Sequence, residues 1–210
     1  MIRTRYLLPG LAALGLAACA SAPVHYYTLL GPAPVADATV AAAPFQFELM
    51  PVGIPAQVDQ PQLVIRQGGQ GMAPLGGERW IAPLSEEVRG ALSADLALAL
   101  HTQDVTGLPG GGPPRLRIKV DLRRFDSALG DYALVDAAWS VRALRGGTTL
   151  ACTSQLREPV GAGSAALVEG HQRALARLAG AIAQVAAPVA AGRTPACPRP
   201  GTGAKETGNG

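Results

Sequence analysis

Residues 115–123 read RLRIKVDLR, and this stretch decides the class of fold. Its leucine, isoleucine and valine alternate with arginine, lysine and aspartate, which is the period of a strand with one buried face. Two further alternating runs, residues 133–141 and residues 150–156, follow after short glycine-containing turns. Strands joined by short turns pair in antiparallel fashion. The sequence therefore predicts an antiparallel meander at the centre of the domain.

Apolar residues at helical spacing lie on both sides of this meander. A serine and two glutamates at 85–87 indicate a helix start, because a hydroxyl caps the first amides and acids suit the positive end of the dipole. The apolar spacing of this first helix continues to Leu100. Ser164 opens a second apolar stripe, and Pro188 is expected to close that helix.

Short β-prone runs precede the first helix, at residues 26–29, 45–50 and 63–65. The Ala- and Pro-rich stretch 31–44 is either an irregular connection or a mobile linker. The order of strands, helix, strands and helix predicts an α+β fold, in which two helices pack on a largely antiparallel sheet. We assign this single domain to residues 26–191 and predict a disordered tail over 192–210.

The first residues have the pattern of an export signal. Arg3 and Arg5 precede an apolar run that is too short to span a bilayer, so residues 1–18 are interpreted as a signal peptide. The run ends in Leu-Ala-Ala-Cys, which resembles the bacterial lipobox. Cys19 would then be the lipidated first residue, with palmitate among its acyl chains, and residues 19–25 a short tether. The alternative is an ordinary secretory signal with a coincidental cysteine.

Composition narrows the possible functions. The 210 residues are 48% hydrophobic, which suits one core, and carry a formal charge of +3. Loss of Arg3 and Arg5 with the signal lowers this charge to +1, and only two lysines are present. Nucleic-acid binding is not expected, because it relies on clustered cations.

Candidate catalytic groups are few. The three histidines, His25, His101 and His171, lack the spacing of a metal site, so we expect no metal and no cofactor. Ser164 and His171 are the only nearby serine and histidine, yet two helical turns place them about 10 Å apart. Ser164 is better interpreted as a helix cap than as a nucleophile, and His171 as a structural residue than as a general base. We therefore predict that the protein is not an enzyme.

Two further features leave alternatives open. Cys152 and Cys197 could form a disulfide in the oxidising periplasm, unless Cys197 in its Pro- and Gly-rich surroundings never approaches the sheet. The cations of residues 115–123 could touch anionic lipid headgroups, or they could simply keep a strand face soluble.

One cluster of motifs resembles the PqiC/YmbA family of ABC-type transport auxiliary lipoproteins. It comprises VGIP at 52–55, DQPQLVIR at 59–66 and ERWIAPL at 78–84. The resemblance extends from about Tyr26 to Val189. Gln57 departs from it, because the family often has an aromatic residue there.

The resemblance implies a periplasm-facing lipoprotein of the outer membrane in a Gram-negative bacterium. Such a protein would work with a mammalian-cell-entry (MCE) domain protein and an inner-membrane component in phospholipid transport, with a homo-oligomeric ring as a further expectation. Asp59, Pro61, Gln62, Arg66 and Trp80 are then either partner-binding or structural residues. The alternatives are a structural or assembly lipoprotein that supports another outer-membrane machine, and an envelope hydrolase.

Overall fold

The computed structural model describes residues 23–31, 41–110 and 112–199. The predicted meander forms from β5 (Arg115–Ala128), β6 (Tyr132–Ala143) and β7 (Thr149–Pro159), all antiparallel. Their inward residues alternate as the sequence predicts, and Val120 lies opposite Trp139, which lies opposite Cys152. β2 (Gln46–Leu49) adds a parallel fourth strand beside β5.

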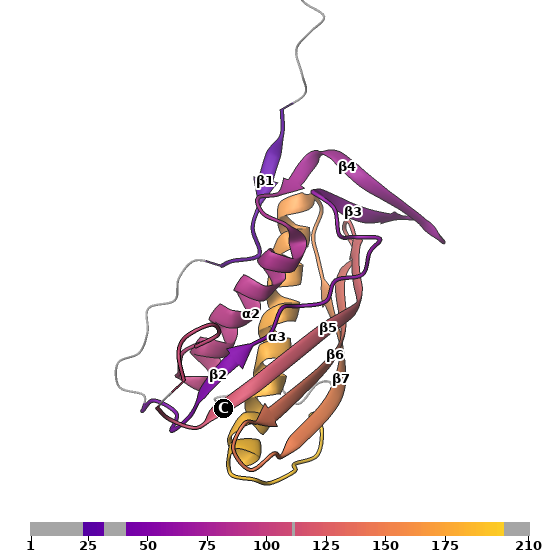
Figure 1. The fold of residues 1–210 in the computed structure, drawn as a ribbon. Coiled ribbons are helices and arrows are strands. Elements are labelled where there is room, and N and C mark those ends of the chain that lie inside the picture. The colour runs from indigo at the N-terminus through magenta and orange to yellow at the C-terminus, as the bar shows by residue number, and fades with distance from the viewer. Residues whose placement is uncertain (1–22, 32–40, 111, 200–210) are drawn as a thin grey trace, which may run out of the picture.

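A second, smaller sheet lies at the end of the molecule where the described chain begins (Figure 1). It contains β1 (His25–Tyr27), β4 (Gly71–Trp80) and β3 (Gln62–Gln67), with β4 in the middle. β3 and β4 form an antiparallel hairpin, and β1 runs parallel to β4. The sequence patterns did not predict β4. We call this three-stranded sheet the small sheet and the four-stranded sheet of β2, β5, β6 and β7 the large sheet.

Two helices complete the core. α3 (Ser164–Ala190) lies along β5, β6 and β7, and α2 (Leu84–Leu100) packs beside α3 (Figure 1). The α+β fold with two helices on mainly antiparallel strands is thus confirmed, with the strands divided between two sheets. Among the described residues, no helix has both the length and the apolar character needed to cross a membrane.

The helix ends differ from the sequence prediction. Neither helix has a side-chain cap: Pro83 precedes α2 and Gly163 precedes α3, so Ser85 and Ser164 lie inside their helices. Pro188 does not close α3, which continues to Ala190. A proline in a helix removes one hydrogen bond. Burial of the last apolar residues of the stripe, including Val189 at 0% exposure, offsets this loss and holds the final turn against the sheet.

Candidate docking site

The motif residues meet in a shallow pocket of about 400 Å³, which we call the notch. One wall is the turn before β3, at Asp59, Gln60 and Pro61. The other is the connection between β4 and α2, residues 80–84. The Trp80 amide donates a 2.9 Å hydrogen bond to the carbonyl of Pro61, and this bond fixes the two walls together.

Trp80 forms the rigid base of the notch. Its side chain is 5% exposed, and its ring packs edge-on against Phe125 of β5 with centroids 6.2 Å apart. This edge-to-face arrangement is a favourable one for aromatic rings. Trp80 therefore shapes the notch from below and offers little of its own surface to a partner.

The rim of the notch carries groups that a partner could reach. Ile81 is 61% exposed, and Asp59 and Pro61 are also exposed. An exposed isoleucine beside prolines and one carboxylate offers an apolar contact with a single negative charge. Such a surface suits the binding of a partner with an apolar patch.

The structure separates the five predicted partner-binding residues into two groups. Asp59, Pro61 and Trp80 line the notch. Gln62 begins β3 and lies opposite Arg79 in the small sheet, next to the notch but not in its lining. Arg66 lies near the far end of β3.

Arg66 has a partner inside the protein. Its guanidinium donates to Asp126 Oδ2 on β5 from Nε at 3.1 Å and from Nη2 at 2.9 Å. Asp126 also accepts from Arg124, and the carboxylate is 5% exposed. This ion pair ties the small sheet to the large sheet, which is a structural role for Arg66. The two residues are 60 positions apart in the sequence, so no local sequence pattern predicts their contact.

His171 of α3 contacts Ser127 of β5. Its Nε2 lies 2.8 Å from the Oγ atom of Ser127, and its ring stacks on Phe125 at 3.8 Å. Burial lowers the pKa of His171 to about 3, against a smaller raising effect from the charge of Asp126. The imidazole is therefore neutral at ordinary pH. Both side chains are buried, so this pair is a structural contact in the core.

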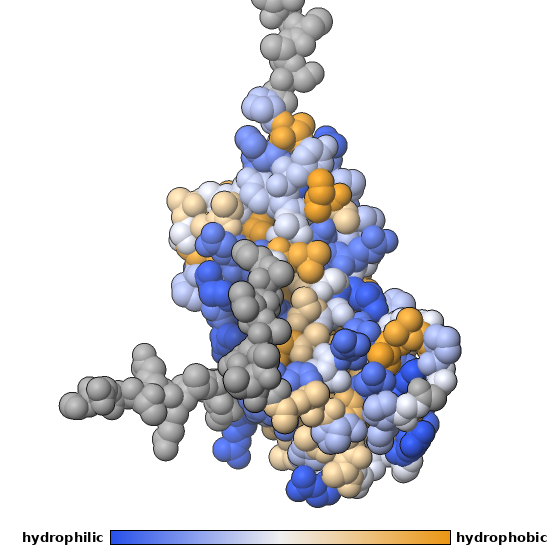
Figure 2. Space-filling view, turned by 90° about the vertical axis from the view of Figure 1, so that its left-hand side faces the viewer, coloured by the Kyte–Doolittle hydropathy of each residue, from blue (hydrophilic) through white to orange (hydrophobic). Residues whose placement is uncertain are grey.

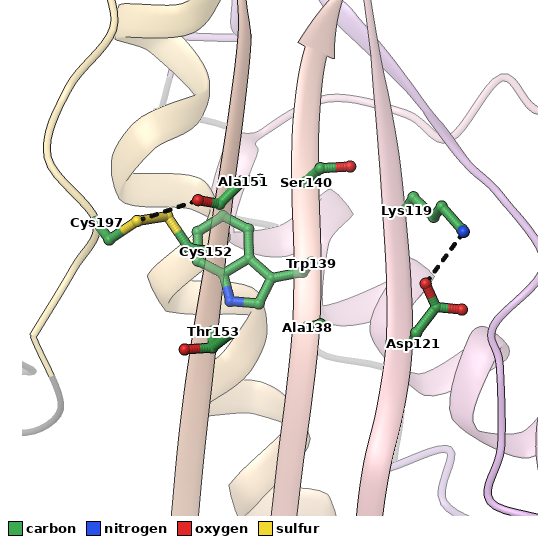
Figure 3. Close-up of a pocket in the computed structure, with 9 residues that line it drawn as sticks. All are labelled: Lys119, Asp121, Ala138, Trp139, Ser140, Ala151, Cys152, Thr153 and Cys197. Carbon is green, nitrogen blue, oxygen red and sulfur yellow. Dashed lines mark hydrogen bonds and ion pairs between the residues drawn. A yellow bond between two sulfur atoms is a disulfide. The ribbon is translucent and has the colours of Figure 1, made fainter.

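A second hollow, of about 570 Å³, lies over the outer face of the large sheet (Figure 3). Small side chains of β6 and β7, at Ala138, Ser140 and Ala151, leave this space open. Its charged pair, Lys119 and Asp121, is joined by a 3.1 Å ion pair. No set of three His, Cys, Asp or Glu side chains within residues 23–31, 41–110 and 112–199 could hold a metal ion.

The hollow is bordered by a disulfide between Cys152 on β7 and Cys197 (Figure 3). Their Cα atoms are 5.7 Å apart, within the usual range for a disulfide. Residues 193–199 have no regular secondary structure, and this bond holds them beside the large sheet. The structure covers the predicted tail only as far as Arg199, while Cys19 and the predicted signal peptide lie outside the described residues.

The cations of β5 are largely paired. Arg115 and Arg117 both contact Glu48 of β2, at 3.2 and 3.0 Å, and Arg123 pairs with Asp136 of β6. These pairs neutralise much of the basic stripe that the sequence shows. The interpretation of the stripe as a solvated strand face agrees with this pairing better than lipid contact does.

Comparison with known proteins identifies the family. The family described as ABC-type transport auxiliary lipoprotein components matches residues 27–183. The chain belongs to this family. The matched stretch includes both walls of the notch and both helices up to the last turns of α3. The family is a class of transport components and not of enzymes.

Solved structures share the fold. One protein of uncharacterised function has a TM-score of 0.61 at 17% identity, with 78% of this chain and 98% of that chain covered. A Xanthomonas campestris protein of the DUF330 family has a TM-score of 0.58 at 14% identity, with 80% and 96% covered. At such identities the likeness shows the fold alone. No curated protein sequence matches the chain.

Proposed function

We propose that the protein is a non-enzymatic, lipid-anchored docking component of an MCE-type system that moves phospholipid between the two membranes of a Gram-negative envelope. It would sit at the periplasmic face of the outer membrane, attached through Cys19, and contribute to the integrity of that membrane. Membership of the transport auxiliary lipoprotein family is the observation that carries this proposal. The export pattern of residues 1–19 supports it.

The notch is the surface that we assign to the partner. It is formed by two of the three motifs that carry the family resemblance. Its rim offers exposed Ile81, Pro61 and Asp59 beside the buried Trp80. A few residues that cluster in well-packed pockets carry most of the binding energy at interfaces. The partner would be the MCE-domain protein, with the inner-membrane component behind it.

The test is capture of the partner from living envelopes. The full-length lipidated protein is crosslinked briefly, purified after gentle solubilisation, and analysed by mass spectrometry for proteins and lipids. We expect recovery of an MCE-domain protein, and we expect Asp59→Lys to reduce that recovery several-fold. Glu169→Lys makes the same charge change at an exposed position on α3, outside the notch, and serves as the matched control.

Two outcomes would count against the proposal. Repeated recovery of assembly or cell-wall proteins alone would favour the second candidate, a structural lipoprotein that serves another outer-membrane machine. Equal recovery with Asp59→Lys and Glu169→Lys would remove the notch as the docking site, while leaving the partner identified.

A further inference from the structure

The outer side of β1 carries exposed residues that the notch does not use. Tyr26 lies opposite Arg79 in the parallel pairing of β1 and β4, so their side chains share one face of the small sheet. Val24 lies two residues before Tyr26 on the same side of the extended chain. Tyr26 is 58% exposed and Val24 is 42% exposed. We call Val24, Tyr26 and Arg79 the outer β1 face.

The opposite side of β1 is fixed to the domain. Tyr27 packs against the core and lies opposite the buried Trp80, and the carbonyl of Tyr27 accepts a 2.9 Å hydrogen bond from Ile81. His25 Nδ1 lies 3.1 Å from Glu78 Oε1. β1 is therefore held in one orientation, which keeps the outer β1 face directed away from the core.

Arg79 differs from the cations of β5. No hydrogen bond or ion pair joins its guanidinium to another of the described residues, and its Nε atom is shielded from solvent without a partner. Arg115, Arg117 and Arg123, in contrast, each contact a carboxylate. An unpaired cation next to a tyrosine and a valine suits the headgroup region of a bilayer. There, phosphates accept from guanidinium groups, and tyrosine keeps its ring in apolar surroundings and its hydroxyl in water.

The length of the preceding chain limits where this face can lie. Val24 is the fifth residue after Cys19, so an extended chain places Val24 less than about 20 Å from the lipidated residue. β1 is at the upper end of the molecule, and hydrophobic residues are exposed near that end (Figures 1 and 2). An anchored domain would thus hold this face close to the membrane surface at a high effective concentration.

We propose that the outer β1 face rests on the phospholipid surface, with Arg79 bound to lipid phosphate and with Val24 and Tyr26 at the boundary of the acyl region. This inference rests on the proposed lipid anchor at Cys19. The contact would fix the orientation of the domain relative to the membrane. The acyl chains at Cys19, and not this face, would attach the protein to the membrane.

The test uses a fluorophore at a single new thiol. Lipidation occupies Cys19 and the disulfide occupies the other two cysteines, so Tyr26→Cys can be labelled alone with an environment-sensitive dye in the full lipidated protein. The matched control is Leu108→Cys. Leu108 is 59% exposed and precedes the start of β5, at the end of the large sheet that lies away from the small sheet (Figure 1). Both proteins are reconstituted into vesicles of phosphatidylethanolamine and phosphatidylglycerol that contain a headgroup-level spin label.

We expect quenching at position 26 to exceed quenching at position 108 several-fold. Arg79→Glu in the Tyr26→Cys protein should remove most of this difference, because it repels the anionic lipid. Labelling at Val24→Cys repeats the measurement with Tyr26 intact.

Three outcomes would overturn the inference in distinguishable ways. Equal quenching at positions 26 and 108 in a protein that floats with vesicles rejects the membrane contact and leaves the proposed function standing. Shielding of position 26 only after addition of a partner protein assigns the face to that protein instead of lipid. Failure of the protein to float with vesicles rejects the anchor, and with it both proposals.

Discussion

At the scale of single residues, His171 shows how burial controls charge in this core. Its imidazole is enclosed between Phe125 and Ser127, and within the described part of the chain only the Ser127 hydroxyl offers it a hydrogen bond. The Nδ1 atom is buried with no partner among the described residues. A charged imidazole would gain little there, which is the reason for the pKa of about 3.

This low pKa predicts a pH dependence of stability. In the unfolded chain His171 takes up a proton near pH 6.5, whereas in the folded protein it remains neutral until about pH 3. The unfolded state therefore binds more protons between these values, and the free energy of unfolding falls with decreasing pH. The slope from this one group is at most about 1.4 kcal/mol per pH unit.

Denaturant unfolding at pH 7, 6 and 5 measures this slope. His171→Gln removes the titrating group and retains an amide that can bond Ser127, so its stability should depend less on pH over this range. Identical slopes for wild type and His171→Gln would show that His171 is not the source.

At the scale of elements, the segment after α3 depends on a single covalent tie. Residues 193–199 contain no helix or strand, and Cys197 joins them to β7 through Cys152. The disulfide closes a loop across 45 residues that includes all of α3. It therefore restricts the unfolded chain over the element that covers the large sheet.

Loss of this disulfide should lower the free energy of unfolding by about 4 kcal/mol on the chain-entropy account. Cys197→Ser provides the variant, and the wild-type protein unfolded with a reductant provides the independent comparison. Reductant should shift the wild-type transition and leave that of Cys197→Ser unchanged. A thiol count of two in the oxidised protein that lacks Cys19 would contradict the bond directly.

Two strands, β5 and β4, show how much of this structure the sequence predicts. β5 could be predicted because Leu116, Ile118 and Val120 alternate with charged residues and are all buried. β4 could not, because three glycines and Pro74 break any alternation in residues 71–80. It is a strand only because β3 and β1 pair with its two edges, and such pairing depends on tertiary contacts.

The candidate site could also be predicted only in part from the sequence. Asp59, Pro61 and Trp80 were found through motifs that resemble a family, and the Trp80 to Pro61 hydrogen bond joins them in space. Arg66 belongs to the same motif, but its neighbour Asp126 lies on another sheet. A sequence motif thus locates a strand and a turn together, while only the fold shows which side chains face inward.

At the scale of the whole molecule, the notch and the outer β1 face lie on the same small sheet, where the chain arrives from the predicted anchor. Trp80 belongs to the notch, and its neighbour Arg79 belongs to the outer β1 face. A partner that docks in the notch would therefore meet the protein beside the membrane surface. The notch lies beside the membrane in the cell only if the protein carries the lipid anchor at Cys19.

Replacement of residues 1–19 by a cleaved secretory signal tests the anchor. The mature chain would then begin at Ala20 without a lipid. We expect it to fractionate with soluble periplasmic proteins, because the outer β1 face alone is too small to hold the domain, whereas several acyl chains together bind firmly. The wild-type chain should take up an alkyne-labelled palmitate and sediment with outer membranes on a density gradient. Retention of the lipid-free chain in the outer membrane after a high-salt wash would mean that contacts of the folded domain, and not Cys19, hold it there.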